Sequence, residues 1–398
     1  MNIQQDKSKI AIVAVGYNRL NSMRRLLTSL SNAHYEHDEI PLVISIDCSG
    51  DTDLYDFVNQ FEWKHGTKYV NIQKTRLGLK AHILQCGDLT RYFRGVIILE
   101  DDIFVSEYFY QYVEKAVDFY YDEDRVGGIS LYQNEVGSKC APVVYLNDGS
   151  DTYLKMGAAS WGECWTDRQW SKFKEWYNNL DGNDIASIDM PEHIKKWKKA
   201  WSVYYKAFLT VTNRYFVFPF ISHTTCFGDA GEHASSSSNI GQANLLCGER
   251  NYTFKPFDEM VRYDTYGTNE DVFKWIGLPK EDLCVDFRCE KINIRKCRYI
   301  LTPAKMHYKV VKSFGLNMRP IELNIKYNIE GKDLFLYDTI DGNANAASVG
   351  YPWTISNYYL RGYNRRLSLQ HVIISYYETA KRALRRLGGR IKNNARKH

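Results

Sequence analysis

The sequence predicts an α/β fold in which a mostly parallel sheet is flanked by helices, and three observations carry this prediction. Segments such as Ile10–Val15 and Pro41–Ile46 are apolar along their whole length, which is typical of strands buried on both faces of a parallel sheet. These segments alternate with segments of helical periodicity, as expected where a helix connects each parallel strand to the next. Several of them also end abruptly in polar residues, where such sheets bind ligands.

The individual elements follow in order along the first 100 residues. After the first strand, Met23, Leu26, Leu27 and Leu30 fall on one face of a helix. A second helix is expected over Leu79–Phe93. The expected strands are Ile10–Val15, Pro41–Ile46, Lys68–Ile72 and Val96–Leu99.

Polar residues directly follow three of these four strands. They are Tyr17-Asn18-Arg19, Asp47 and the acidic segment Glu100-Asp101-Asp102. Three adjacent carboxylates destabilise one another unless a cation offsets them, and hard divalent ions with oxygen ligands do so. The acidic segment therefore predicts a Mg²⁺ or Mn²⁺ site for a diphosphate. The alternative is a solvated turn that caps the next helix.

The charge of the chain is concentrated at its C-terminal end. The 398 residues carry a formal net charge of +5, but Val372–His398 alone carries +7, so that the rest sums to −2. A basic surface of the kind that binds nucleic acid is therefore not expected over the body of the protein.

The compartment is predicted from cysteines and apolar stretches. Nine cysteines, an odd number without paired CxxC motifs, indicate free thiols in a reducing compartment. The N-terminal residues contain no apolar stretch of signal-peptide length, and no stretch approaches the roughly 20 residues that span a bilayer. The sequence thus predicts a cytoplasmic protein.

The basic tail begins with a helical pattern. Apolar residues recur at helical spacing from Leu369 to Leu387, and Lys and Arg cluster from Lys381 onward. Such a helix can lie on an anionic membrane surface, which predicts peripheral association with the inner face of the cell membrane. The alternatives are a helix packed on the body or contact with RNA.

The order of the motifs resembles the nucleotide-sugar-binding half of GT-A glycosyltransferases. It is especially similar to the N-acetylglucosaminyltransferase I type and to bacterial family 2 enzymes. The resemblance spans roughly residues 9–235 and implies a Rossmann-like GT-A fold with a C-terminal extension ending in a basic amphipathic helix. The motifs are Tyr17-Asn18-Arg19 with Arg24-Arg25, Asp47-Cys48-Ser49-Gly50, the acidic segment, Ala159-Ser160-Trp161-Gly162 and Phe218–His233.

With this resemblance, the chain divides into four parts. Residues 1–125 are expected to form the nucleotide-sugar-binding half and residues 126–281 the acceptor-binding half. Residues 282–365 form an extension of short strands, and residues 366–398 the basic helix and tail.

The resemblance also implies roles on the donor side. Asp102 is expected to ligate a Mn²⁺ or Mg²⁺ ion that bridges the diphosphate, with Asp101 beside the ribose. Arg19 and Asp47 are expected around the nucleoside. The further donor-side candidates are Glu100, Lys80 and His233.

On the acceptor side, an inverting enzyme needs a carboxylate base that takes the proton of the attacking hydroxyl. The resemblance places it after the Trp-rich segment, so Asp181 and Asp184 are candidates, with Glu163 as a third. Trp161 is the candidate for stacking on the acceptor sugar. Inversion is itself implied by the resemblance, since a retaining enzyme can carry the same acidic segment.

The expected activity is metal-dependent transfer of a hexosyl or N-acetylhexosaminyl group from a UDP-sugar to a saccharide or lipid-linked saccharide, in the synthesis of a cell-surface glycan. One alternative is a nucleotidyltransferase acting on sugar phosphates, although Gly16-Tyr-Asn-Arg19 is not the Gly-rich basic loop that such enzymes usually carry. The other is a non-catalytic carbohydrate-binding protein on a transferase fold.

Overall fold

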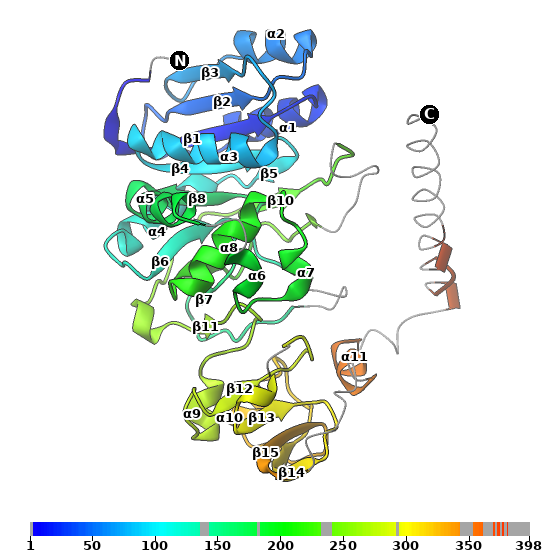
Figure 1. The fold of residues 1–398 in the computed structure, drawn as a ribbon. Coiled ribbons are helices and arrows are strands. Elements are labelled where there is room, and N and C mark those ends of the chain that lie inside the picture. The colour runs from blue at the N-terminus through cyan, green and yellow to red at the C-terminus, as the bar shows by residue number, and fades with distance from the viewer. Residues whose placement is uncertain are drawn as a thin grey trace.

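The computed structural model of the chain describes residues 3–135, 143–180, 184–231, 241–291, 294–342 and 353–360, together with separate helical residues between 369 and 380. Within these residues, a large mixed sheet with helices on both faces is followed by a smaller sheet (Figure 1). The α/β class expected from the sequence is therefore confirmed.

Nine described strands form the large sheet, and five of the eight neighbouring pairs are parallel. Its order runs from β3 at the top of Figure 1 to β11 below the centre. The strands in spatial order are β3 (Lys68–Ile72), β2 (Leu42–Ile46), β1 (Asp6–Gly16), β4 (Phe93–Glu100), β8 (Glu163–Thr166), β6 (Val126–Ser130), β9 (Tyr215–Pro219), β7 (Thr152–Lys155) and β11 (Arg262–Tyr263).

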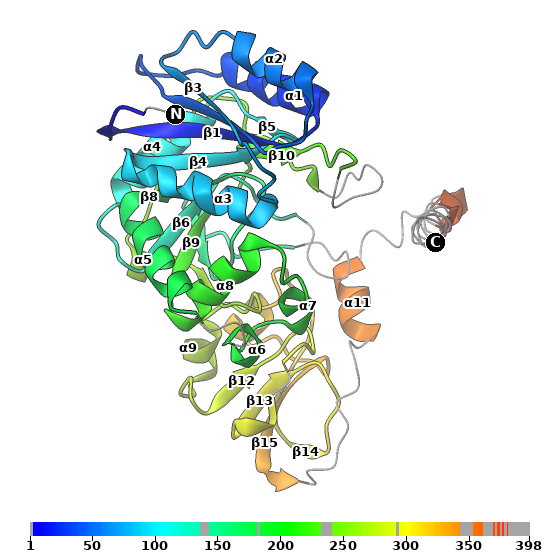
Figure 2. The same cartoon turned by 45° about the horizontal axis from the view of Figure 1, so that its top comes forward.

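The first four strands are all parallel, and their apolar runs pack against helices on both faces. Val13 of β1 lies between Val43 of β2 and Ile98 of β4. One face packs against α1 (Leu20–Ser31), α2 (Thr52–Gln60) and α4 (Phe109–Tyr120), and the other against α3 (Leu79–Gly87), α5 (Asp167–Asn178) and α8 (Trp201–Val211). The second view separates the two helical layers (Figure 2).

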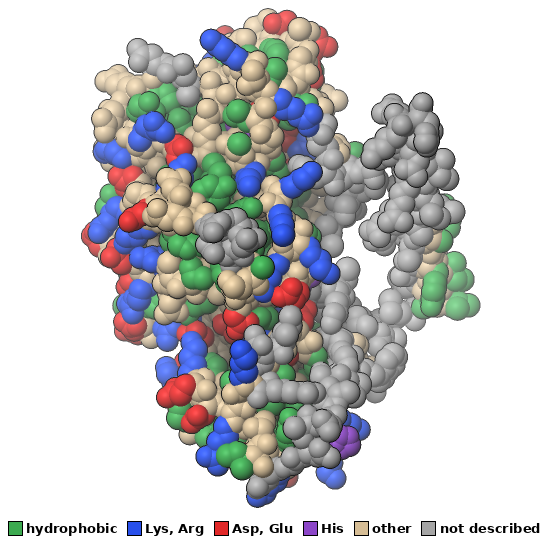
Figure 3. Space-filling model, viewed as in Figure 1, with side chains coloured by type: hydrophobic (Ala, Val, Ile, Leu, Met, Phe, Trp, Pro, Cys, Tyr) green, Lys and Arg blue, Asp and Glu red, His purple; other side chains and the backbone are tan. Residues whose placement is uncertain are grey.

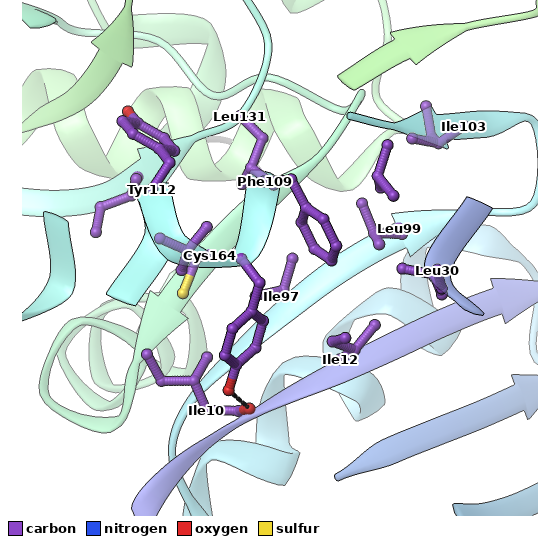
Figure 4. Close-up of a cluster of buried hydrophobic side chains, with 14 of the residues drawn as sticks. Ile10, Ile12, Leu30, Ile97, Leu99, Ile103, Phe109, Tyr112, Leu131 and Cys164 are labelled. Carbon is purple, nitrogen blue, oxygen red and sulfur yellow. Dashed lines mark hydrogen bonds between the residues drawn. The ribbon is translucent and has the colours of Figure 1, made fainter. Parts of the chain in front are cut away.

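Figure 4 shows part of the core on the α1 and α4 side. Leu30 of α1 and Phe109 of α4 lie over Ile12, Ile97 and Leu99 of the central strands, and all five side chains are fully buried. Apolar burial of this extent stabilises the sheet by about 25 cal/mol for each Å² removed from water. The carboxyl ends of β1 and β4 are thus held on a rigid support.

The second half of the sheet contains the antiparallel pairs. Strand β8 runs antiparallel to both β4 and β6, and β7 runs antiparallel to β9. A two-stranded ribbon of β5 (Ile103–Val105) and β10 (Thr224–Cys226) brings the segment after β10 beside the acidic segment. The short helices α6 (Asp184–Ser187) and α7 (Glu192–Lys195) precede α8.

The helix expected over Leu79–Phe93 ends earlier than the sequence pattern indicated. Helix α3 ends at Gly87, a 3₁₀ turn covers Asp88–Arg91, and β4 already begins at Phe93. The Trp170 indole donates a hydrogen bond to Asp88 at 2.8 Å, and its ring lies directly over Gly87. Packing against α5 therefore ends the helix here.

Replacing Gly87 with alanine is expected to lower the free energy of unfolding by about 1–3 kcal/mol, the usual cost of overpacking. A Cβ atom at this position would lie 2.2 Å from the Trp170 ring. Urea denaturation measures the effect. The matched control is Gly248→Ala, where an added Cβ meets nothing within 4 Å. Equal stability of both variants would contradict the tight packing of the ring on α3.

The smaller sheet follows the large one in the chain. Its strands, in the order β12 (Leu283–Val285), β13 (Tyr299–Thr302), β15 (Leu334–Gly342) and β14 (Tyr308–Phe314), enclose a core with the short helices α9 (Val272–Ile276) and α10 (Leu323–Lys326). Ile355 and Tyr358 of α11 (Trp353–Leu360) belong to the same core. Short strands were expected over residues 282–365, and the boundaries at residues 125, 281 and 365 stay predictions.

Most of the basic tail lies outside the described residues. The described residues from Leu369 to Ala380 are helical, and the apolar side chains of Leu369, Ile373 and Tyr376 among them are exposed. None of the helices described is both long enough and apolar enough to cross a bilayer.

Candidate functional site

A cavity of about 230 Å³ lies at the carboxyl ends of β1, β2 and β4, and we call it the strand-edge cavity. Carboxyl ends of parallel strands meet at one edge of a sheet, so residues that are far apart in the chain converge here. The cavity is lined by Val15, Gly16, Tyr17, Asn18, Arg19, Asp47, Arg76, Gly78, Leu79, His82, Glu100, Asp101, Asp102, Asp229 and Gly231. Five residues proposed from the sequence are among them: Arg19, Asp47, Glu100, Asp101 and Asp102.

Arg19 binds the acidic segment at the wall of the cavity. It stands directly before α1, and its guanidinium pairs with both carboxylate oxygens of Asp101. Its Nη1 atom also donates to Oδ2 of Asp102 at 3.1 Å. One cation thus faces three carboxyl groups, so the segment keeps an excess of negative charge.

Burial and mutual repulsion act on the acidic segment. Burial, followed by the charges of Asp102 and Asp101, raises the pKa of Glu100 to about 8. Burial also raises the pKa of Asp101 to about 6, although Arg19 acts in the opposite direction. An added cation would favour the ionised forms of these groups.

Asp47 positions the loop that follows β3. Its Oδ1 atom accepts from the backbone N–H groups of Cys48 and Leu77, both at 2.8 Å, and its Oδ2 atom from that of Gly78 at 2.9 Å. Gly78 has φ +78°, a conformation that favours glycine, and stands directly before α3. Burial would raise the pKa of Asp47, but these three hydrogen bonds lower it below its usual value.

His82 adds a neutral polar group to the same wall. Its Nε2 atom lies 2.7 Å from Oγ of Ser45, and the ring is 2% exposed. Burial lowers the pKa of His82 to about 4, although Asp47 acts in the opposite direction. The imidazole is therefore uncharged at neutral pH.

Asp229 was not proposed from the sequence, yet it completes the cavity. Its carboxylate accepts from Ser22 Oγ at 2.6 Å and pairs with Arg25, and its carbonyl oxygen accepts from Arg19 at 3.2 Å. The β5–β10 ribbon brings it there, helped by a bond from the Phe227 N–H to the Asp102 carbonyl at 2.9 Å. The only local signal was its place in the glycine-containing loop 227–231.

Two donor-side candidates do not lie in this arrangement. The Lys80 ammonium stands over the Tyr204 ring, 4.5 Å from its centroid, and does not line the strand-edge cavity. His233 lies outside the described residues. Their donor-side roles stay predictions.

The acceptor-side candidates are spread over several places. Glu163 in β8 is 2% exposed, does not line the strand-edge cavity, and its Oε2 atom has no hydrogen-bond partner among the described residues. Asp181 lies outside the described residues, as does the side chain of Asp184, the first residue of α6. Trp161 lines a separate cavity on the α8 side of the sheet and meets the Tyr132 ring edge-on at 4.7 Å.

The carboxylate oxygens of the cavity suit a hard divalent ion that takes most of its ligands from a bound substrate. No group of three or more His, Cys, Asp or Glu side chains within the described part of the chain could hold a metal ion by itself. Both oxygens of Asp101 are engaged by Arg19, whereas Oδ1 of Asp102 has no hydrogen bond among these residues. Asp102 can thus supply one ligand, which fits an ion whose remaining ligands come from a diphosphate.

Comparison with known proteins identifies no family. No family model matches the sequence, and no curated protein matches it. Among solved structures, similarity is found to S. aureus TarS 1-349 in complex with UDP-GlcNAc, at 16% identity over 58% of this chain and 61% of that one, with a TM-score of 0.39. A second is the mannosyltransferase PcManGT from Pyrobaculum calidifontis in complex with GDP-Man and Mn²⁺, at 13% identity over 44% and 49% of the two chains and a TM-score of 0.31. Each match spans less than two thirds of the other chain. Identities and TM-scores this low assign no function to this chain. The function is therefore inferred from the residues of the cavity.

Proposed function

We propose that the protein is a glycosyltransferase that moves a sugar from a UDP-sugar to a saccharide acceptor with the help of Mn²⁺ or Mg²⁺. One observation carries this proposal. The acidic segment, Arg19 and Asp47 line a single cavity at the carboxyl edge of a mostly parallel sheet. This is the placement that a nucleoside diphosphate with a bridging cation requires.

The cavity residues divide into nucleoside and diphosphate groups. Asp47 lies at the end of β2 beside Gly78, so its wall suits the nucleoside. Asp102 would hold the divalent ion, which supplies positive charge to the departing diphosphate. Arg19 fixes the orientation of Asp101 and Asp102, and its guanidinium adds a second positive charge beside the leaving group.

The acceptor hydroxyl needs a base for an inverting displacement. Glu163 is 2% exposed and lines neither the strand-edge cavity nor the cavity that contains Trp161. Burial, with a further contribution from Glu100, also raises the pKa of Glu163 well above its usual value, which disfavours the ionised form that a base needs. We therefore assign the base to Asp181 or Asp184, and Trp161 to the acceptor side. Inverted configuration in the product would support this assignment, whereas retention would contradict it.

The test of the proposed function is donor binding and turnover. UDP is expected to raise the melting temperature when Mn²⁺ is present, because a ligand that binds only the folded state stabilises it. Chelation of the metal should remove most of this shift. With a panel of UDP-sugars, slow release of UDP without acceptor is expected for the true donor. Release of pyrophosphate from UTP and a sugar phosphate would instead support a nucleotidyltransferase, and UDP binding without any turnover a carbohydrate-binding protein.

For the tail, we propose peripheral association with an anionic membrane in the cytoplasm, where a lipid-linked acceptor in cell-surface glycan synthesis would lie. The exposed Leu369, Ile373 and Tyr376 support this, together with the charge of +7 over Val372–His398. Removal of residues 369–398 is expected to reduce sedimentation with phosphatidylserine vesicles at least tenfold and to leave UDP affinity unchanged. Equal sedimentation of both forms would contradict a membrane role.

A further inference from the structure

A second cavity, of about 320 Å³, lies between the α7–α8 segment and the loop after β12, and we call it the basic cavity. Its lining brings together side chains from five separate parts of the chain, within residues 134–161, 191–206, 265–267 and 288–290 and at Phe218. On the face shown in Figure 3, Lys and Arg side chains gather near the middle, around the position of α7 in Figure 1. The residues that matter here are Lys155, Trp161, Trp197, Lys206, Arg288 and Glu290.

The charges of this cavity are opposite to those of the strand-edge cavity. Lys155 from the end of β7, Lys206 from α8 and Arg288 from the loop after β12 face it, against one carboxylate, Glu290, among the described lining residues. The strand-edge cavity is lined by five carboxyl groups and two arginines. The strand-edge cavity therefore offers ligands for a cation, whereas the basic cavity offers cations that can bind an anionic group directly.

Lys206 is the least compensated of these cations. Among the described residues its ammonium has no hydrogen bond or ion pair, and the nearby Lys155 donates to the hydroxyl of Tyr145 at 2.7 Å rather than to a carboxylate. Burial, followed by the charge of Lys155, lowers the pKa of Lys206 to about 7. Arg288 acts in the same direction, while Asp264 and Glu290 oppose it. A bound anion would offset this repulsion.

Aromatic side chains accompany these cations. Trp161 lines the cavity at one side, and Trp197, which is 61% exposed, lies at the solvent side. Aromatic faces pack on the C–H groups of sugar rings. A ligand that combines a sugar ring with an anionic group would use both kinds of contact.

The basic cavity reaches the edge of the sheet where the strand-edge cavity lies. Glu163 pairs with Ile98 in the antiparallel β4–β8 pair. Trp161 precedes Glu163 by two residues, and Glu100 follows Ile98 by two, so both lie at the same end of this pair. Trp161 therefore lies at the end of the β4–β8 pair that carries the acidic segment.

We propose that the basic cavity binds the acceptor, and that this acceptor is a saccharide carrying a phosphate or carboxylate group held by Lys206, Arg288 and Lys155. The proposal rests on the proposed glycosyltransferase function, whose acceptor it specifies. In this arrangement the anionic group orients the sugar, while Trp161 lies toward the donor.

The first experiment measures how far a ligand protects Lys206 from acetic anhydride at pH 7, read by mass spectrometry. Glucose 6-phosphate, glucuronic acid, glucose and inorganic phosphate serve as probes. At least one of the two anionic sugars is expected to reduce acetylation of Lys206 threefold or more, and which one does so separates phosphate from carboxylate recognition. Exposed Lys199 is the internal reference. Equal protection by glucose, or by inorganic phosphate alone, would overturn the proposal.

Variants then separate this proposal from the proposed function. Lys206→Gln is expected to weaken binding of the protecting sugar at least tenfold, Lys206→Arg to restore most of it, and Lys199→Gln to have no effect. UDP affinity in the presence of Mn²⁺ should stay within twofold in all three. If UDP binds but no anionic sugar protects Lys206, the acceptor proposal fails alone. If an anionic sugar protects Lys206 but UDP does not bind, the glycosyltransferase proposal fails, and with it the assignment of this ligand as an acceptor.

Discussion

Asp102→Asn is expected to lower the rate of sugar transfer by about 100-fold or more, while the melting temperature of the protein changes little. Loss of one preorganised electrostatic group at a developing charge typically costs about 10²–10³ in rate. The amide keeps an oxygen that can accept from Arg19 Nη1, so the local packing is retained. The amide is, however, a poor ligand for a divalent ion, so the affinity for Mn²⁺ in the presence of UDP should fall in parallel.

The measurement is a radiolabelled transfer assay at several Mn²⁺ concentrations. Asp118→Asn is the matched control, because its carboxylate is 64% exposed and pairs with Arg94 on the surface. An Asp102→Asn enzyme with full activity, or with an unchanged requirement for metal, would show that this carboxylate does not hold the ion.

Asp47→Asn is expected to lower both stability and donor affinity. The carboxylate accepts three backbone N–H bonds, and an amide would turn an N–H₂ group toward at least one of these donors. A buried donor left without a partner costs about 1–3 kcal/mol. Since Leu77 and Gly78 border the strand-edge cavity, their displacement should also weaken UDP binding tenfold or more.

The stability difference between the wild type and Asp47→Asn should depend on pH. Because the pKa of Asp47 is lowered in the folded protein, its ionised form stabilises the fold fully above its usual value of about 3.9. This stabilisation is lost as the pH falls through the lower pKa of the folded state. Urea denaturation at pH 7 and in steps below pH 4 tests this, and a difference that grew toward low pH would contradict it.

The prediction of the fold from sequence succeeded where burial leaves a simple pattern. Strands β1, β2 and β4 contain continuous apolar runs, and the pattern located them within a few residues. The half-buried β3 was also located, over Lys68–Ile72. The end of α3 was missed because it depends on the Trp170 ring, about 80 residues further along the chain. Beyond residue 125 the strands are short and partly antiparallel, and their order leaves no periodic signal.

The cavity residues were likewise predicted where a local pattern marks them and missed where a long-range contact positions them. Arg19, Asp47 and the acidic segment stand immediately after strands, and they do line one cavity. Asp229 was not predicted as a cavity residue, because its position depends on the β5–β10 pairing, which joins residues more than 100 positions apart. Glu163 was the third candidate for the base from the sequence, and the structure places it among the four buried residues of β8.

The sequence by itself determined which segments become buried strands and which polar side chains stand at their carboxyl ends. Both depend on the local alternation of apolar and polar residues, since burial of a short segment is decided by its own composition. Only the tertiary structure decided the partners: Arg19 with Asp101, Asp47 with the backbone of Leu77 and Gly78, and Lys206 beside Lys155. Such pairings depend on strand order, register and helix packing, which join distant parts of the chain through many weak contacts and leave no mark on local periodicity.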